Sequence, residues 1–204
     1  MKLPAFVLAL PIVILSAAVM AEAECLTKDD LAGLTSVVYE GDQVENFMPA
    51  PAQPFLTMSV EIFPDGFSSV YLLTHGDFLQ EKGEYQDDAV VSGSTIPYDY
   101  GIEDTGLPVP VPVPGGGWQT DVTVIDGGGD YDEPQTVTWG KARTVSIGSC
   151  SYQAFDVTIA YATDDNYLER LTYIAALGLG YLVYREAEGT EPETISATAI
   201  RVAK

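Results

Sequence analysis

One stretch of this sequence gathers carboxylates closely enough to bind a cation. The segment 126–133 reads DGGGDYDE and contains Asp126, Asp130, Asp132 and Glu133. Calcium prefers several oxygen ligands on a flexible loop, and this glycine-rich spacing can supply them. The segment departs from the EF-hand pattern in the places of its glycine and distal glutamate, and a solvated acidic turn is the favoured alternative. Calcium is the single cofactor that the sequence suggests, and otherwise no cofactor is expected.

Catalytic chemistry has few other candidates. His75 is the only histidine, and no G-x-S-x-G nucleophile motif occurs. One histidine and two cysteines do not make a zinc ligand set. Two carboxylates facing each other across a cleft can hydrolyse a glycosidic bond, but with 30 acidic residues the sequence singles out no pair. We therefore assign no catalytic residue and keep a carboxylate-based hydrolase of envelope polysaccharide as an alternative.

Aromatic residues offer a second kind of candidate surface. The chain has 12 tyrosines, and several of these, together with Trp118 and Trp139, could line a groove for a sugar or an apolar ligand. The plainer interpretation is that tyrosines are good strand formers that pack across strands. The ligand-facing residues therefore stay unknown at this stage.

The first 23 residues are expected to be a secretory signal peptide and not part of the fold. Lys2 gives a positive start, an apolar run over 5–15 follows, and cleavage is expected after Ala21 or Ala23. The apolar run is too short for a comfortable membrane span. We therefore expect a periplasmic or secreted protein that is not an integral membrane protein.

The two cysteines, Cys25 and Cys150, are expected to form a disulfide, because export places them in an oxidising compartment. Such a bond would tie the mature N-terminus to a strand far along the chain. Two unpaired thiols are the alternative. A lipid-anchored Cys25 is disfavoured because Glu24 precedes it, where a small residue is needed.

The charge of the chain excludes some partners. Nine basic residues stand against 30 acidic ones, which gives a formal net charge of −21. Nucleic acid and anionic membrane surfaces require clusters of lysine and arginine, so neither is expected as a partner. Solubility outside the cytoplasm explains such a charge, and a cation site or a basic partner is the more specific alternative.

The elements that must position these residues are strands. Thr27 and Asp30 predict one short helix near residues 25–35, and nearly everything after it is extended, in roughly ten or eleven strands. In 55–63, FLTMSVEIF, apolar residues alternate with polar ones, which predicts a half-buried strand with one wet face. GGGDYDEP, 127–134, is expected to be a loop. The fold class is therefore all-β with minor α: a curved antiparallel sheet, half-barrel or sandwich.

A stretch rich in proline and glycine, 106–117, interrupts this pattern near the middle of the chain. Its alternating prolines lack amide donors, which excludes a central strand and favours a polyproline II conformation. A linker between two domains would leave two small halves with little core each. We therefore predict that residues 24–204 form a single β-rich domain, which this stretch crosses as a rigid loop or edge segment.

The closing segment RLTYIAALGLGYLVYRE, 170–186, resembles the final meander of uncharacterised exported bacterial proteins. TVSIGSCSYQAFDVTIAY, 144–161, and the N-terminal segment 25–47 add to the likeness. The wider group is loosely similar to lipoprotein-carrier half-barrels, which hold a hydrophobic guest against a covering helix. This chain departs from them in having only one short helix to cover its sheet.

The favoured functional hypothesis is a non-enzymatic periplasmic binding or envelope-associated domain. Its partner would be a small apolar ligand or an envelope protein. The expected ligand surface is a concave apolar face with room beside it, including Met58, Val60, Phe155, Val157 and Ile159. An outer-membrane barrel is a third hypothesis, against which the polar segment 77–88 counts because it cannot supply a lipid-facing belt.

Overall fold

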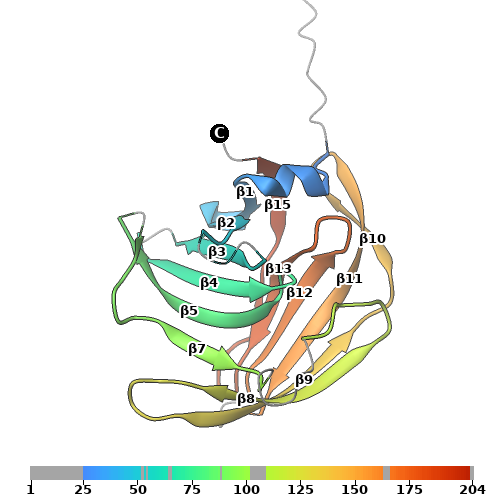
Figure 1. Cartoon of the computed structure of the whole chain (residues 1–204). Coiled ribbons are helices and arrows are strands. Elements are labelled where there is room, and N and C mark those ends of the chain that lie inside the picture. Colours follow the sequence, from blue (N-terminus) through green and yellow to red (C-terminus); the bar gives the residue numbers. More distant parts are fainter. Residues whose placement is uncertain are drawn as a thin grey trace, which may run out of the picture.

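The computed structural model describes residues 25–51, 53, 55–63, 66–87, 89–101, 109–162 and 166–202. The expected signal peptide, residues 1–23, and the first part of the proline- and glycine-rich stretch, 106–108, lie outside the described residues. Figure 1 shows strands in nearly every described part of the chain, and the helices found among the described residues are two short 3₁₀ helices. The expectation of an all-β fold with minor helix is confirmed.

The first half of the chain forms a meander of neighbouring antiparallel strands. Its elements are η1 Lys28–Ala32, β1 Thr35–Tyr39, η2 Glu40–Asp42, β2 Val44–Pro49, β3 Thr57–Ile62, β4 Ser68–Thr74, β5 Phe78–Gln86, β6 Ala89–Val90 and β7 Ile96–Asp99. Each of β1 to β5 pairs with the next, as short polar turns favour. The hairpin of β1 and β2 turns at Gly41, whose φ of 79° suits glycine.

The second half continues the same sheet. Its strands are β8 Gly117–Val124, β9 Tyr131–Trp139, β10 Arg143–Ile147, β11 Cys150–Tyr161, β12 Leu168–Ile174, β13 Leu179–Glu186, β14 Glu193–Thr194 and β15 Ala197–Val202. The short strands β6, β7 and β14 were not expected from the sequence, since two to four residues carry too little alternation to identify them.

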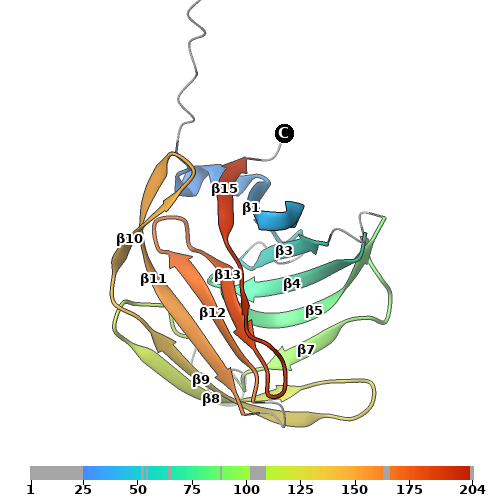
Figure 2. The ribbon, with the colours of Figure 1, turned by 180° about the vertical axis from the view of Figure 1, so that it is seen from behind.

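The sheet is open but strongly curved. Its hydrogen-bonded order runs β14-β13-β12-β11-β9-β8-β7-β5-β4-β3-β2-β1-β15, with β6 and β10 beside this path. The two outermost strands, β14 and β15, are nevertheless consecutive in the chain and separated only by residues 195–196. Figures 1 and 2 show the resulting shape: β1 to β5 curve over the strands β11 to β13. The expected curved antiparallel sheet is confirmed.

A disulfide fixes the N-terminal end of the described chain. Cys25 and Cys150 are bonded, with their Cα atoms 5.4 Å apart, as the sequence predicts. The short helix η1 follows directly, and Asp30 accepts hydrogen bonds from both the amide and the hydroxyl of Thr27. Figure 1 shows η1 beside β15, so the two ends of the described chain lie near each other.

Two apolar clusters each join residues from before and after the central loop. One, at the disulfide end, includes Val37 and Phe47 with Ile147 and Ile174. The other includes Phe78, Tyr98, Tyr100, Val109, Val122, Val124, Val137, Trp139, Phe155, Val157, Ile159 and Tyr173. Burial of apolar surface therefore joins the two halves of the chain, and a single domain over 24–204 stays a prediction.

The described part of the central loop, from Val109 onward, contains no strand until β8 begins at Gly117. Gly116 packs so closely on Trp139 that a Cβ atom there would lie 2.6 Å from the indole ring. Gly115 donates its amide to the carbonyl groups of Trp139 and Gly140. The glycines thus let this segment lie directly on β9, where a larger residue would not fit.

Apolar and polar residues alternate in β3 as expected, but the polar face of this strand does not lie in solvent. Met58 and Val60 are buried in a third apolar cluster, on the face covered by Ala50 and Leu56. The polar face is buried as well: Ser59 is 0% exposed and Glu61 is 8% exposed. The expectation of a wet face is therefore wrong for β3, because the sheet curves around that polar face and encloses it.

Two β-bulges change which side chains point inward. Between β4 and β5 the register shifts at Leu73, so that Leu79 and Lys82 lie on the same face although they are three residues apart. Between β12 and β13 the register shifts at Leu171, so that Leu182 and Arg185 also lie on the same face. A bulge inserts one extra residue in one strand and redirects the side chains that follow. Both cationic side chains are aimed inward in this way.

Helices in the described part of the chain are all short, and none of them has the length and apolar character that a membrane crossing requires.

Candidate functional site: a polar cavity inside the curved sheet

The curved sheet surrounds a partly open cavity of about 860 Å³ with an acidic lining. Six carboxylates contribute to it: Glu45, Glu61, Asp77, Asp132, Glu133 and Glu169. Strands β2 to β5 supply one wall, and strands β9 and β11 to β13 supply the other. The volume lies within the range typical of small-molecule sites, roughly 300–1,000 Å³.

Tyrosines and leucines complete the lining. The tyrosines are Tyr71, Tyr98, Tyr131, Tyr161 and Tyr167, and the leucines are Leu73, Leu79, Leu171 and Leu182. Lys82 and Arg185 are the two cationic residues among those that line the cavity. The surface thus mixes apolar patches with hydrogen-bonding groups, which is the composition expected of a site for an amphiphilic molecule.

Strand pairing places the first pair of carboxylates. In the ladder of β2 and β3, Glu45 stands directly opposite Glu61. Two like charges on directly opposed residues repel each other, and this arrangement is destabilising when both are ionised. The register of the two strands therefore favours a state in which at least one of these carboxyl groups carries a proton.

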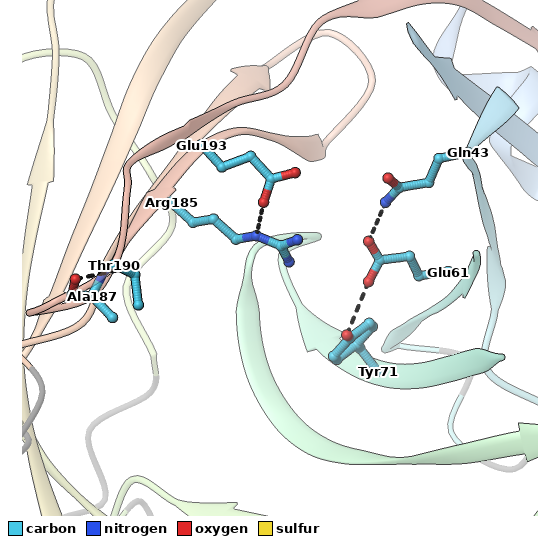
Figure 3. Close-up of polar contacts among 7 residues, drawn as sticks. All are labelled: Gln43, Glu61, Tyr71, Arg185, Ala187, Thr190 and Glu193. Carbon is cyan, nitrogen blue, oxygen red and sulfur yellow. Dashed lines mark hydrogen bonds and ion pairs between the residues drawn. The ribbon is translucent and has the colours of Figure 1, made fainter. Parts of the chain in front are cut away.

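Neighbouring donors of the protein hold both of these carboxyl groups. Glu45 accepts hydrogen bonds from the hydroxyls of Tyr39, at 2.6 Å, and Ser59, at 2.5 Å. Glu61 accepts one from the amide of Gln43 and one from the hydroxyl of Tyr71, the latter at 3.0 Å. Figure 3 shows this second set, with Glu61 between Gln43 and Tyr71. All four oxygens are thus occupied by protein groups.

The opposite wall is built in a similar way. The hydroxyl of Tyr161 donates to Glu169, and the ring of Tyr161 packs on Tyr167 with centroids 5.3 Å apart. The side-chain amide of Gln135 donates to Glu133 at 2.9 Å. Paired hydrogen bonds of this kind are what makes buried polar groups tolerable.

The two cations are also engaged. Arg185 forms an ion pair with Glu193 of β14, with Nε and Oε2 2.6 Å apart. Figure 3 shows its guanidinium group pointing from β13 toward the side of the cavity where Glu61 lies. Lys82 places its ammonium group 5.6 Å from the centre of the Tyr98 ring, which is within the range of a cation–π contact.

Asp77 differs from the other carboxylates in the cavity. It is 4% exposed, and neither of its carboxylate oxygens has a hydrogen-bond partner of good geometry, although the backbone amides of Asp77 and Phe78 lie near. The turn that carries it is fixed, because Gly180 donates its amide to the carbonyl of Gly76 at 3.0 Å. Asp77 is thus a buried acid on a fixed turn, and its carboxyl group has no hydrogen-bond partner of good geometry.

The carboxylates predicted to bind calcium are not brought together as a metal site. Among the residues that the structure describes, no group of three or more His, Cys, Asp or Glu side chains lies close enough to hold a metal ion. The expected loop over 127–134 is instead shorter, because β9 begins at Tyr131. Glu133, which lies in β9, is buried in the cavity. Asp132 of the same strand is exposed, and so are Asp126 and Asp130, which precede the strand.

The five residues of the expected apolar face do not line the cavity. Met58 and Val60 lie in one cluster, and Phe155, Val157 and Ile159 lie in another, packed by the protein's own side chains. Trp118 and Trp139 also pack in the second cluster. Some of the tyrosines do line the cavity. The polar face of β3 is the feature of the sequence that could have indicated the cavity.

His75 has a structural place in the fold. It lies in the turn between β4 and β5 with a φ of 55°, and its Nε2 atom is 3.1 Å from the carbonyl oxygen of Val109. Its own carbonyl accepts a hydrogen bond from the hydroxyl of Tyr173. It thus ties the central loop to this turn, and no catalytic partner was expected for it.

Burial changes the acidity of these carboxyl groups. It raises the pKa of Glu45 from its ordinary value of 4.5 to about 7, and Glu61 and Glu169 add repulsion in the same direction. Burial is also the main cause that raises the pKa of Glu61, of Glu169 and, most strongly, of Asp77. Near neutral pH the cavity therefore holds protons that free carboxylates would release.

These shifts predict that the protein becomes less stable as the pH rises. Between pH 4.5 and about 7 the folded chain keeps the Glu45 proton, whereas the unfolded chain has lost it. Stability from this group is complete below pH 4.5 and is lost as pH passes through the folded pKa. We expect the urea concentration at the unfolding midpoint to fall as the pH is raised from about 5 to about 8. Glu45→Gln, which mimics the neutral acid, should make the midpoint depend less on pH.

The matched control is Glu191→Gln, because Glu191 is exposed and lies outside the cavity. This variant should keep the slope of the unsubstituted protein. An equal slope in all three proteins would contradict the protonation of Glu45 in the folded state.

Comparison with known proteins yields one distant structural likeness. No protein-family model and no curated protein matches the sequence. Among solved structures, the chain is similar to the hypothetical lipoprotein YmcC from Escherichia coli K12, with a TM-score of 0.40 and 10% sequence identity. The match covers 86% of this chain and 92% of that one. A likeness this distant supports no inference about function, and the resemblance to lipoprotein carriers stays a prediction.

Proposed function

We propose that this chain is an exported, non-enzymatic binding protein that holds a small guest molecule inside its curved sheet. The observation that carries the proposal is the cavity of about 860 Å³ with its mixed lining of carboxylates, tyrosines and leucines. Enclosing polar groups in a protein interior is costly unless something hydrogen-bonds to them. A guest with polar and apolar parts would hydrogen-bond to the polar groups of the lining and pack against its leucines.

The guest in this proposal is amphiphilic, whereas the sequence suggested a small apolar ligand. A purely apolar molecule would cover Asp77, whose oxygens have no partner of good geometry, without satisfying it, which costs free energy. The disulfide between Cys25 and Cys150 supports export, because such bonds persist in oxidising compartments. The periplasm or the exterior remains our proposed location, in agreement with the expected signal peptide.

A carboxylate-based hydrolase is the second candidate, because carboxylates from both walls share one cavity. Glu45 and Glu169 lie near enough for each to affect the other electrostatically. A general acid, however, must direct its proton at the substrate. Both oxygens of Glu45 accept hydrogen bonds from Tyr39 and Ser59, and Glu61 is held in the same way. We therefore favour binding over hydrolysis.

The proposal predicts that blocking the cavity removes the guest. Ala162 is exposed and lines the cavity, so that Ala162→Trp should fill its mouth at little cost to folding. In native mass spectra of protein purified from the exported fraction, we expect the unsubstituted chain to carry a non-covalent mass and Ala162→Trp to lose most of it.

Ala142→Trp serves as the matched control, since Ala142 is an exposed alanine outside the cavity. It should retain the guest. Equal occupancy in both variants, or no guest in any protein, would contradict the proposed binding site. Turnover of an envelope polysaccharide that Glu45→Gln abolishes would favour the hydrolase instead.

A further inference from the structure

We propose that the guest carries an ammonium group on an apolar chain, and that Asp77 is the residue that pairs with this ammonium group. The inference rests on the proposed binding function and specifies the chemical class of the guest. Its starting point is that Asp77 is the one carboxylate of the cavity lining whose two oxygens are buried and left without a partner of good geometry.

The protein supplies no cation to Asp77. Of the two basic residues that line the cavity, Arg185 is paired with Glu193 and Lys82 lies over the ring of Tyr98. Burial is the main cause that keeps Asp77 from ionising, and the effects that act on it include no nearby positive charge. A buried acid of this kind gains most when a ligand provides the missing charge or donor.

The position of Asp77 is fixed before any guest arrives. Gly76, which precedes it, accepts a hydrogen bond from the amide of Gly180, and the carbonyl of His75 accepts one from Tyr173. A Cβ atom placed on Gly180 would lie 3.3 Å from the Cβ atom of Asp77. The carboxyl group is therefore held on a rigid turn, which reduces the entropy that binding would cost.

The surroundings of Asp77 select an organic cation over a metal ion. Leu73 and Leu79 flank Asp77 in the chain and line the same cavity, and Leu171 packs against Gly180 on the facing side. A metal ion needs several oxygen or nitrogen ligands, and no group of three suitable acidic, histidine or cysteine side chains is found in the described ranges. One carboxylate beside leucines, and near enough to Tyr100 and Tyr173 to act on them electrostatically, suits a single positive charge attached to an aliphatic stem.

Calorimetric titration with two matched probes, n-hexylamine and 1-hexanol, tests this assignment. Both probes have the same aliphatic stem, so that their affinities differ through the head group. We expect the unsubstituted protein to bind hexylamine at least about tenfold more tightly than hexanol, because charge-assisted hydrogen bonds are stronger than neutral ones. Asp77→Asn should remove this preference, because it weakens hexylamine binding far more than hexanol binding.

Asp121→Asn is the matched control, since Asp121 is exposed and lies outside the cavity. It should keep the preference for the amine. Asp77→Leu provides a second neutral variant in case the asparagine is poorly tolerated. Equal affinities of both probes for the unsubstituted protein, or a preference that survives both Asp77 substitutions, would overturn the inference.

These outcomes are separable from failure of the proposed function. If the purified protein carries a guest that Ala162→Trp loses, yet shows no preference for the amine, binding stands and the ammonium assignment fails. If no guest is carried and neither probe binds, both proposals fail together.

Discussion

Replacing Gly76 with alanine is expected to destabilise the protein by about 3 kcal/mol or more, the combined size of left-handed backbone strain and overpacking. Gly76 has a φ of 79°, a conformation that alanine adopts only with strain. In addition, a Cβ atom there would lie 2.2 Å from the carbonyl oxygen of Gly178, in the facing turn between β12 and β13. The two turns would have to separate to admit a single methyl group.

Gly41→Ala separates these two causes. Gly41 has the same φ of 79°, but nothing lies within 4 Å of the position that its Cβ atom would take. This variant should therefore show only the backbone cost, about 1–2 kcal/mol. Urea unfolding of both variants measures the difference. Equal losses would show that the turns at Gly76 and Gly178 are not in close contact in solution.

Removing the disulfide is the second change with a large expected effect. The bond joins residues 125 apart in sequence, and the chain-entropy estimate for so long a loop is about 4–5 kcal/mol. The double variant Cys25→Ser, Cys150→Ser should lose stability of that order. Leu26 and Leu31, which pack against the cluster at the disulfide end, should become more exposed because η1 is no longer tied down.

The unsubstituted protein under reducing conditions provides the control for this second prediction. Its urea midpoint should fall to that of the double variant, because both lack the same bond. Hydrogen exchange of the amides around η1 should rise in both. A loss below about 1 kcal/mol would mean that the unfolded chain gains little freedom when the bond is absent.

Alternation and turn chemistry were enough to predict much of the fold. The disulfide, the short helix around Lys28, the hairpin of β1 and β2 and the long strand β11 could all be identified from residue types alone. Each of these depends on local pattern or on the pairing of the only two cysteines. A curved sheet was expected, but the sequence could not show which side chains the curve encloses, because the register shifts at Leu73 and Leu171 have no clear mark in the sequence.

The cavity was missed for the same reason. The polar residues of β3, Ser59 and Glu61, carry the pattern of a strand that faces water. Only the curvature shows that this face is enclosed, opposite Glu169 of β12. The density of charge in the segment 126–133 suggested a calcium site. Of its four carboxylates, however, Glu133 alone is buried in the cavity. Spacing along the chain says little about which side chains meet across a sheet.

The connection between β14 and β15 has a consequence for selectivity. Residues 195 and 196 tether the two outermost strands of the sheet, and an extended chain spans no more than about 3.6 Å per residue. The rims of the sheet can therefore move apart only a short way before this tether is taut. We therefore expect the curve to open too little to admit a broad, branched molecule, whatever its charge.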